Sequence, residues 1–142
     1  MGPRRTASGA RRKGGILLLV IRESGIRRRF GEILKDNGYL VIEATDWPES
    51  IGKALTLAPD AIVLEVTLLA PGATEAARFL RSHERTAQIP VLALTDGSWR
   101  PSTLRQMGLD HVLRRPCSQT ELLDAVDHLF AVRAGAREKS GS

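Results

Sequence analysis

Ala61-Ile62-Val63-Leu64-Glu65-Val66 is the stretch that decides the fold of this chain. Four apolar residues in a row, β-branched at Ile62 and Val63, precede a single charge, which predicts a strand buried on both faces. Such strands are typical of parallel sheets covered by helices, and binding sites in open α/β sheets lie at the carboxyl ends of the strands. We therefore expect Glu65 to lie at a site.

Strand-like and helix-like segments alternate on both sides of this stretch. Apolar runs predict strands at residues 16–21, 39–44, 61–65, 91–95 and 111–113. A predicted helix follows each run, although the fourth, Arg100 to Met107, is short and poorly patterned. Two of these helices begin with capping boxes, Asp46 with Glu49 and Ser118 with Glu121. The sequence therefore predicts a single doubly wound (βα)5 domain of the flavodoxin-like kind, with a five-stranded parallel sheet of order 2-1-3-4-5.

The positive charge of the chain lies outside this domain. Residues 1–15 hold five of the 21 basic residues and none of the 16 acidic ones, so the remainder is neutral. We expect residues 1–15 to be a disordered basic arm, 16–132 the domain and 133–142 a flexible polar tail. The arm is either a solvated leader or a contact for nucleic acid or an acidic partner.

Several kinds of site are not expected. No apolar run is long enough to cross a bilayer, and one cysteine, Cys117, excludes an internal disulfide and fits a reducing, cytoplasmic location. Neither a P-loop nor a GxGxxG motif appears, so no cofactor is expected. His83, His111 and His128 share no ligand spacing, so no metal site is expected either.

The order of these features resembles the receiver domain of bacterial two-component response regulators over residues 16–130. The segments that carry the resemblance are Ile16-Leu-Leu-Leu-Val-Ile21, Gly38-Tyr39 with Val41-Ile42-Glu43-Ala44, Pro59-Asp60-Ala-Ile-Val-Leu64, Ile89-Pro90-Val91 leading to Thr95, Gly108 with Asp110, and Arg115-Pro116. The resemblance implies five functional positions. The acidic pair that holds Mg²⁺ falls on Ile21 and Arg22, the phosphoacceptor on Glu65, the hydroxyl on Thr95 and the lysine on Arg115.

Only Thr95 is of the residue type that the family uses. Mg²⁺ requires oxygen ligands, whereas Ile21 offers none and Arg22 is cationic. Glu23 would enter the site only after a one-residue shift of the strand, which would invert its two faces. Without a metal, phosphoryl transfer to Glu65 loses its main electrostatic help. We therefore expect a degenerate pseudo-receiver that is not an enzyme.

We expect the domain to bind another protein, a histidine kinase or a downstream signalling protein, and a homodimer is possible. The predicted contact face comprises the last two strands and the last helix, with Trp99, Arg105, Val112 and Asp127 as its residues. Trp99, like Trp47, is either an exposed contact or a half-buried loop anchor. The alternatives are a receiver still phosphorylated on Glu65, a flavodoxin-like cofactor binder, and a nucleic-acid binder through residues 1–15.

The loss of the family's metal ligands around Glu65 leads to a further expectation. A buried Glu65 carboxylate without its metal needs a partner, and the planar guanidinium of Arg115 can hold a carboxylate through two hydrogen bonds. We predict a permanent Glu65–Arg115 ion pair, with Arg22 replacing the positive charge of the metal. In the alternative, both arginines face water and Glu65 is a solvated strand end.

Overall fold

Five parallel strands form one sheet in this computed structural model, which describes residues 15–68, 70, 72–109 and 111–141, with side chains up to residue 132. The strands are β1 (Ile16–Val20), β2 (Leu40–Ala44), β3 (Ala61–Glu65), β4 (Val91–Thr95) and β5 (His111–Arg114). Their spatial order is β2-β1-β3-β4-β5, which confirms the prediction. This order places the end of β3 between the ends of β1 and β4.

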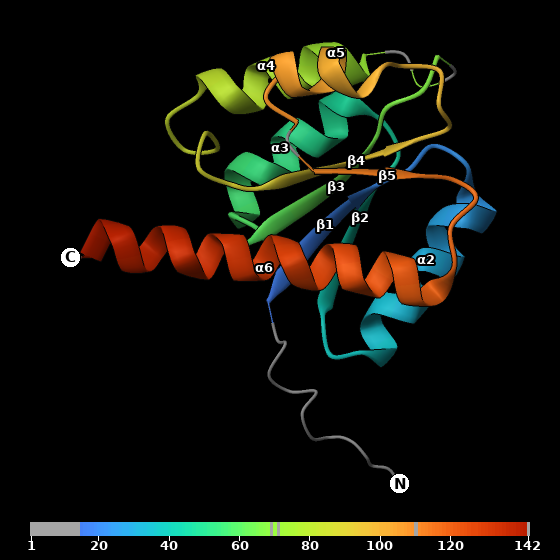
Figure 1. Ribbon diagram of the computed structural model, residues 1–142, viewed down its shortest axis with the longest axis horizontal. Coiled ribbons are helices and arrows are strands. Elements are labelled where there is room, and N and C mark those ends of the chain that lie inside the picture. The colour runs from blue at the N-terminus through green and yellow to red at the C-terminus, as the bar shows by residue number, and fades with distance from the viewer. Residues whose placement is uncertain (1–14, 69, 71, 110, 142) are drawn as a thin grey trace, which may run out of the picture.

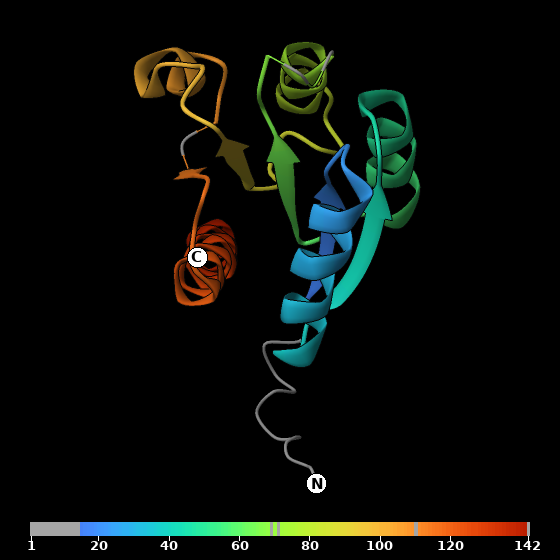
Figure 2. The ribbon, with the colours of Figure 1, turned by 90° about the vertical axis from the view of Figure 1, so that its right-hand side faces the viewer.

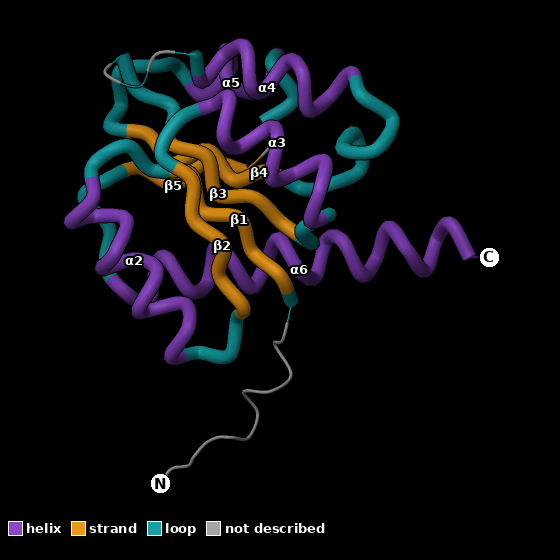
Figure 3. The backbone as a smooth tube through the Cα atoms, turned by 180° about the vertical axis from the view of Figure 1, so that it is seen from behind, coloured by secondary structure: helices purple, strands orange, loops and turns teal. Residues whose placement is uncertain are grey.

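The helices cover the sheet on both faces. They are α2 (Ser24–Asp36), α3 (Trp47–Leu57), α4 (Ala73–Ser82), α5 (Pro101–Gln106) and α6 (Gln119–Gly141). Helices α2 and α6 cover one face, and α3, α4 and α5 cover the other (Figure 1). Figure 2 shows α6 end-on, across the sheet from α4 and α5, and Figure 3 shows the same layers from behind.

Alternating side chains of the strands build two cores, one under each layer of helices. Leu18, Ile62 and Leu64 point into the core beneath α3 and α4, whereas Leu19 and Val63 point into the core beneath α2 and α6. All five are at most 2% exposed. A strand buried on both faces fits the continuous apolar run from which the prediction began.

Both predicted capping boxes are present. The amide of Glu49 donates to Asp46 Oδ1 over 2.9 Å at the start of α3, and the amide of Glu121 donates to Ser118 Oγ over 3.0 Å at the start of α6. The glutamate carboxylates accept in return from the backbone amides of Thr45 and Ser118. Each box satisfies amides that a helix start leaves without a partner and fixes where the helix begins.

The structure differs from the predicted domain boundaries at both the N-terminal and the C-terminal end. Residues 133–141, expected in a flexible tail, have a helical backbone, because α6 continues to Gly141 and runs past the sheet (Figure 1). Alanine, arginine, glutamate and lysine predominate there, and their helix propensity outweighs the glycines. Gly15, expected in the arm, accepts a hydrogen bond from the Leu40 amide and belongs to the sheet. The predicted arm otherwise lies outside the described residues.

None of the helices that the structure describes has the length and apolar content needed to span a bilayer.

Candidate functional site

Glu65 ends β3 and lies in the cleft between the ends of its neighbouring strands. Its residue is 8% exposed, and both carboxylate oxygens have partners. Oε1 accepts from the backbone amide of Arg22 over 2.8 Å, and Oε2 accepts from Nη2 of Arg115 over 3.0 Å. The predicted ion pair with Arg115 is therefore confirmed, and the alternative of a solvated strand end is wrong.

Arg115 reaches this cleft from the connection between β5 and α6. Its amide donates to the Thr95 carbonyl over 2.7 Å, which extends the β4–β5 pairing by one residue. The peptide bond to Pro116 is cis. The side chain is 18% exposed, and its buried Nε has no hydrogen-bond partner among the described residues. The positive charge of Arg115 is therefore opposed mainly by Glu65.

Arg22 contacts Glu65 in a different way from the one expected. Its guanidinium makes no hydrogen bond or ion pair with any described residue, and its side chain is exposed. The backbone amide donates to Glu65 instead. The prediction that the charge of Arg22 replaces the metal is therefore wrong. The side chain lines a pocket of about 110 Å³ together with Trp47, Glu65 and Ala70.

The two other residues around the end of β1 offer no ligand to this pocket. Ile21 is 0% exposed and belongs to the core beneath α2 and α6. Glu23 caps α2, where its Oε1 accepts from the Ile26 amide over 2.6 Å. The Ile26 and Gly25 amides lower the pKa of Glu23 because they stabilise its charged form. The described residues contain no group of three or more side chains suited to hold a metal ion.

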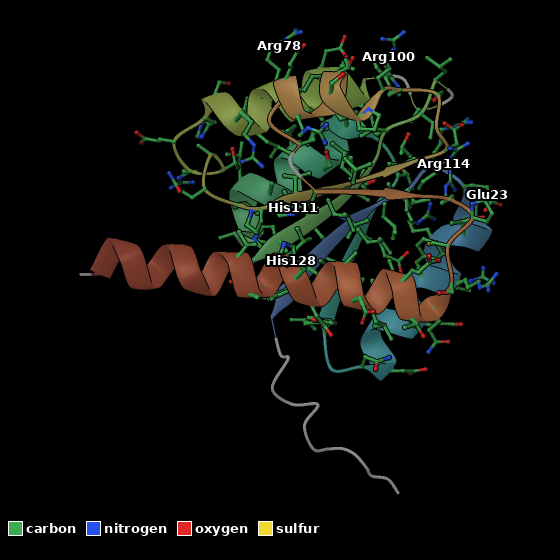
Figure 4. All side chains as sticks on the ribbon, in the orientation of Figure 1. Glu23, Arg78, Arg100, His111, Arg114 and His128 are labelled. Atoms are coloured by element: carbon green, nitrogen blue, oxygen red, sulfur yellow. The ribbon has the colours of Figure 1, made fainter. Side chains whose placement is uncertain are left out.

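Thr95 lies where the resemblance places it. The residue is 3% exposed, and its hydroxyl accepts from the Gly97 amide over 3.3 Å. The guanidinium of Arg114 covers Gly97 so closely that an added Cβ would lie 2.8 Å from its Cζ (Figure 4). Arg114 was not expected at the site. Gly97 has a positive φ of 90° in the tight Asp96-Gly97-Ser98 loop. This turn-forming triplet was the sequence signal available for the close approach of Arg114 to the backbone here.

The four residues predicted to contact a partner have different environments. Arg105 on α5 is exposed, whereas Trp99 and Val112 are half-buried and pack against the core. Asp127 on α6 accepts a short hydrogen bond from the Tyr39 hydroxyl. Burial and the Asp127 carboxylate together raise the pKa of Tyr39. Asp127 thus supports the fold, so its contact with a partner stays a prediction.

Trp47 is the first residue of α3 and is half-buried, as the anchoring interpretation expected. A Cβ on Gly72 would lie 1.7 Å from Cδ1 of Trp47, so the indole rests directly on the backbone before α4. Gly72 has a φ of 87°, a conformation that glycine adopts without steric cost. Trp47 therefore forms part of the wall of the pocket that Glu65 also lines.

Two of the three histidines lie side by side. His111 on β5 and His128 on α6 lie edge to face with ring centroids 5.1 Å apart (Figure 4), although their sequence spacing gave no sign of it. His83 stacks instead on Phe79, with centroids 5.3 Å apart. The pair lies at the amino half of β5, away from Glu65 at the carboxyl end of β3.

Comparison with known proteins finds signalling proteins that are similar to this chain. No family model matches it. It is 31% identical over 120 residues to hybrid signal transduction histidine kinase D of Dictyostelium discoideum, covering 82% of this chain and 8% of that protein. It is 29% identical over 112 residues to the phosphate regulon transcriptional regulatory protein PhoB of Pseudomonas aeruginosa, covering 78% and 49%. The chain thus spans half or less of the length of these two relatives.

A solved structure shares the fold. The signal receiver domain of a signal transduction histidine kinase from Syntrophus aciditrophicus superposes with a TM-score of 0.74 and 24% sequence identity, covering 83% of this chain and 91% of that one. At this identity the likeness concerns the fold alone.

Proposed function

Because this chain carries a response-regulator receiver domain of the two-component signalling type, we propose that it acts as a phosphorylation-independent protein-interaction module. Its single strongest support is the occupied acceptor position: both oxygens of Glu65 already accept hydrogen bonds, one from a backbone amide and one from Arg115. In this proposal the ion pair holds one conformation without a signal. The domain then acts by binding rather than by catalysis.

The surroundings of Glu65 support the proposal electrostatically. Mg²⁺ is bound through one or two carboxylates with near-octahedral geometry. Here Ile21 is buried and apolar, Glu23 is committed to the start of α2, and the Arg22 side chain offers no oxygen ligand. A phosphoryl donor would therefore meet no metal, and in-line transfer would lack its main source of charge stabilisation.

We propose that the partner is a histidine kinase or a downstream signalling protein that contacts α5, β5 and the start of α6. Arg105 is exposed at this face, and Trp99 and Val112 are half-buried. Arginine and tryptophan are the residues that most often dominate binding energy at interfaces. No observation on the described residues favours nucleic acid, and residues 1–14 remain outside them.

Phosphorylation is tested directly with acetyl phosphate. The protein is incubated with the donor, with and without Mg²⁺, beside a receiver that has an intact acidic pair, and its intact mass and tryptophan fluorescence are recorded. We expect no metal-dependent gain of a phosphoryl group and no saturable change in fluorescence. A Mg²⁺-dependent adduct on Glu65 would refute phosphorylation independence and favour a receiver that retains its chemistry.

The partner face is tested by charge reversal. Arg105→Glu lies on the proposed face, and Arg28→Glu is a matched exposed arginine on α2, on the other face of the sheet from α5. Capture of partner proteins by the immobilised domain should fall with the first variant and persist with the second. Loss of capture with the α2 variant alone would show that the face is wrongly assigned.

A further inference from the structure

A groove between α4 and α5 takes no part in the site at Glu65. It has a volume of about 480 Å³, within the range of ligand-binding clefts, and is lined by residues of α4 and of the end of α5: Thr74, Arg78, Arg81, Ser82, Gln106, Met107 and Gly108. Two of these residues are arginines, and none is acidic. The Thr74 hydroxyl donates to the carboxylate of Glu75 over 3.0 Å.

Arg81 is a fixed cation at one side of the groove. Its guanidinium donates to the carbonyls of Gly108, Ala87 and Ile89 over 3.0, 2.7 and 3.0 Å. Gly108 has a φ of 87°, and a Cβ there would lie 2.6 Å from Cγ of Arg81, so the end of α5 closes onto this side chain. These bonds join α4 to the loop before β4 and to the loop before β5, so the wall is formed before any ligand arrives.

Arg78 is a second cation on the same side of α4. It precedes Arg81 by three residues, a spacing that puts both side chains on one helix face. Arg78 is exposed, points away from the sheet (Figure 4), and makes no ion pair or hydrogen bond with any described residue. Its planar guanidinium is therefore free to hold a carboxylate through two hydrogen bonds.

The opposite wall is uncharged and partly apolar. Met107 is half-buried and packs against the core, and Gln106 beside it is exposed with both amide donors and acceptor available to a peptide. A methionine side chain adapts its shape to apolar groups of different form. The groove thus offers positive charge along α4 and an apolar contact along α5.

We propose that this groove binds an acidic segment of a partner protein. A carboxylate of that segment pairs with Arg78, the fixed side chain of Arg81 forms the wall beside it, and an adjacent apolar side chain packs against Met107. A peptide fits better than an inorganic anion, since charge and an apolar surface lie side by side over this volume. The proposal does not depend on Glu65 or on the absence of phosphorylation.

The test uses the whole chain and two capped peptides, EELEEL and its uncharged counterpart QQLQQL. Amide shifts in two-dimensional NMR spectra are followed during titration with each peptide and, separately, with inorganic phosphate. We expect EELEEL to shift the amides of Thr74, Arg78 and Gly108, while QQLQQL and phosphate leave them unchanged. Arg78→Gln should weaken binding by about fivefold, the loss of one net hydrogen-bond contribution. Arg28→Gln, an exposed arginine outside the groove, should leave it unchanged.

Three results would overturn the proposal. The first is that EELEEL shifts only amides outside the groove, or none at millimolar concentration. The second is that both arginine variants weaken binding equally, which would indicate general attraction of charge. The third is that phosphate competes for the same amides, which would indicate a small-anion site. Arg78 is exposed and makes no contact that supports the fold, so a folded Arg78→Gln variant is expected, and its dispersion of amide signals checks this independently.

Discussion

The Glu65–Arg115 ion pair should contribute strongly to stability because it is shielded from solvent. The two side chains are 9% and 18% exposed, and their closest atoms are 3.0 Å apart. Removal of one partner from a buried pair leaves an uncompensated charge and typically costs about 3–5 kcal/mol. Because the Arg22 amide still supports Glu65, we expect Arg115→Met to cost about 3 kcal/mol, the lower end of this range.

The reciprocal change and the double variant isolate the pair itself. Glu65→Gln should cost about 2 kcal/mol, because Arg115 then lacks a counter-ion but keeps an oxygen acceptor. The double variant removes both charges and should cost no more than the weaker single change. The coupling between the two positions is then about 3 kcal/mol. For a chain of this size the slope in urea is about 2 kcal/mol per molar, so Arg115→Met lowers the unfolding midpoint by about 1.5 M.

The assay is urea unfolding at neutral pH, followed by tryptophan fluorescence, for the four members of the cycle. A second cycle on Glu49 and Lys53 provides the control. That pair is 3.0 Å apart but 40% and 35% exposed on the surface of α3, and its coupling should be about 0.3–0.5 kcal/mol. A coupling for Glu65 and Arg115 that is no larger than this control would refute the argument from burial.

Three more changes follow from other contacts. Gly72→Ala should destabilise the domain by more than about 1 kcal/mol in the same urea assay, because the new methyl group meets Trp47 at a positive φ. Tyr39, the sole tyrosine, has a raised pKa in the folded state. Its contribution to the free energy of unfolding is therefore complete below about pH 10 and is lost as the pH rises further. Ultraviolet titration of native protein should therefore show no tyrosinate at a pH where unfolded protein ionises, and Tyr39→Phe should remove this part of the alkaline loss of stability. Glu65→Asp should not restore Mg²⁺-dependent phosphorylation, measured by intact mass, since no metal ligand is added; uptake by this variant would contradict the account of the pocket.

The fold was predictable because each element carries its own local signal. Continuous apolar runs gave the strands, and two capping boxes gave the starts of α3 and α6 at Asp46 and Ser118. The end of α6 was not predictable from polarity, since residues 133–141 have no apolar face to mark a helix and only their propensity favours one. Local signals therefore fix where an element begins better than where a solvent-facing helix ends.

The site was predictable as far as strand order alone could place its residues. Glu65 ends β3 and Arg115 directly follows β5, and the order 2-1-3-4-5 brings the carboxyl ends of these strands to one edge, so their meeting followed from topology and charge. The role of Arg22 did not follow, because the direction of its side chain depends on the turn into α2. There Arg27, not Arg22, donates to the Ile21 carbonyl over 2.8 Å and pairs with Glu43. The hydrogen bond between Tyr39 and Asp127, which lie 88 residues apart, had no signal in the sequence.

The charge balance at Glu65 explains why the proposed module would need no signal. A phosphoryl group adds about 1.5–2 negative charges at neutral pH, and a switch built on it requires cations that are unsatisfied before the reaction. Here the one negative charge of Glu65 meets the one positive charge of Arg115, and the Arg22 amide occupies the other oxygen. These contacts join the ends of β1, β3 and β5 permanently. Any regulation of such a domain then has to act through binding at its other faces, where exposed arginines such as Arg78 and Arg105 remain free.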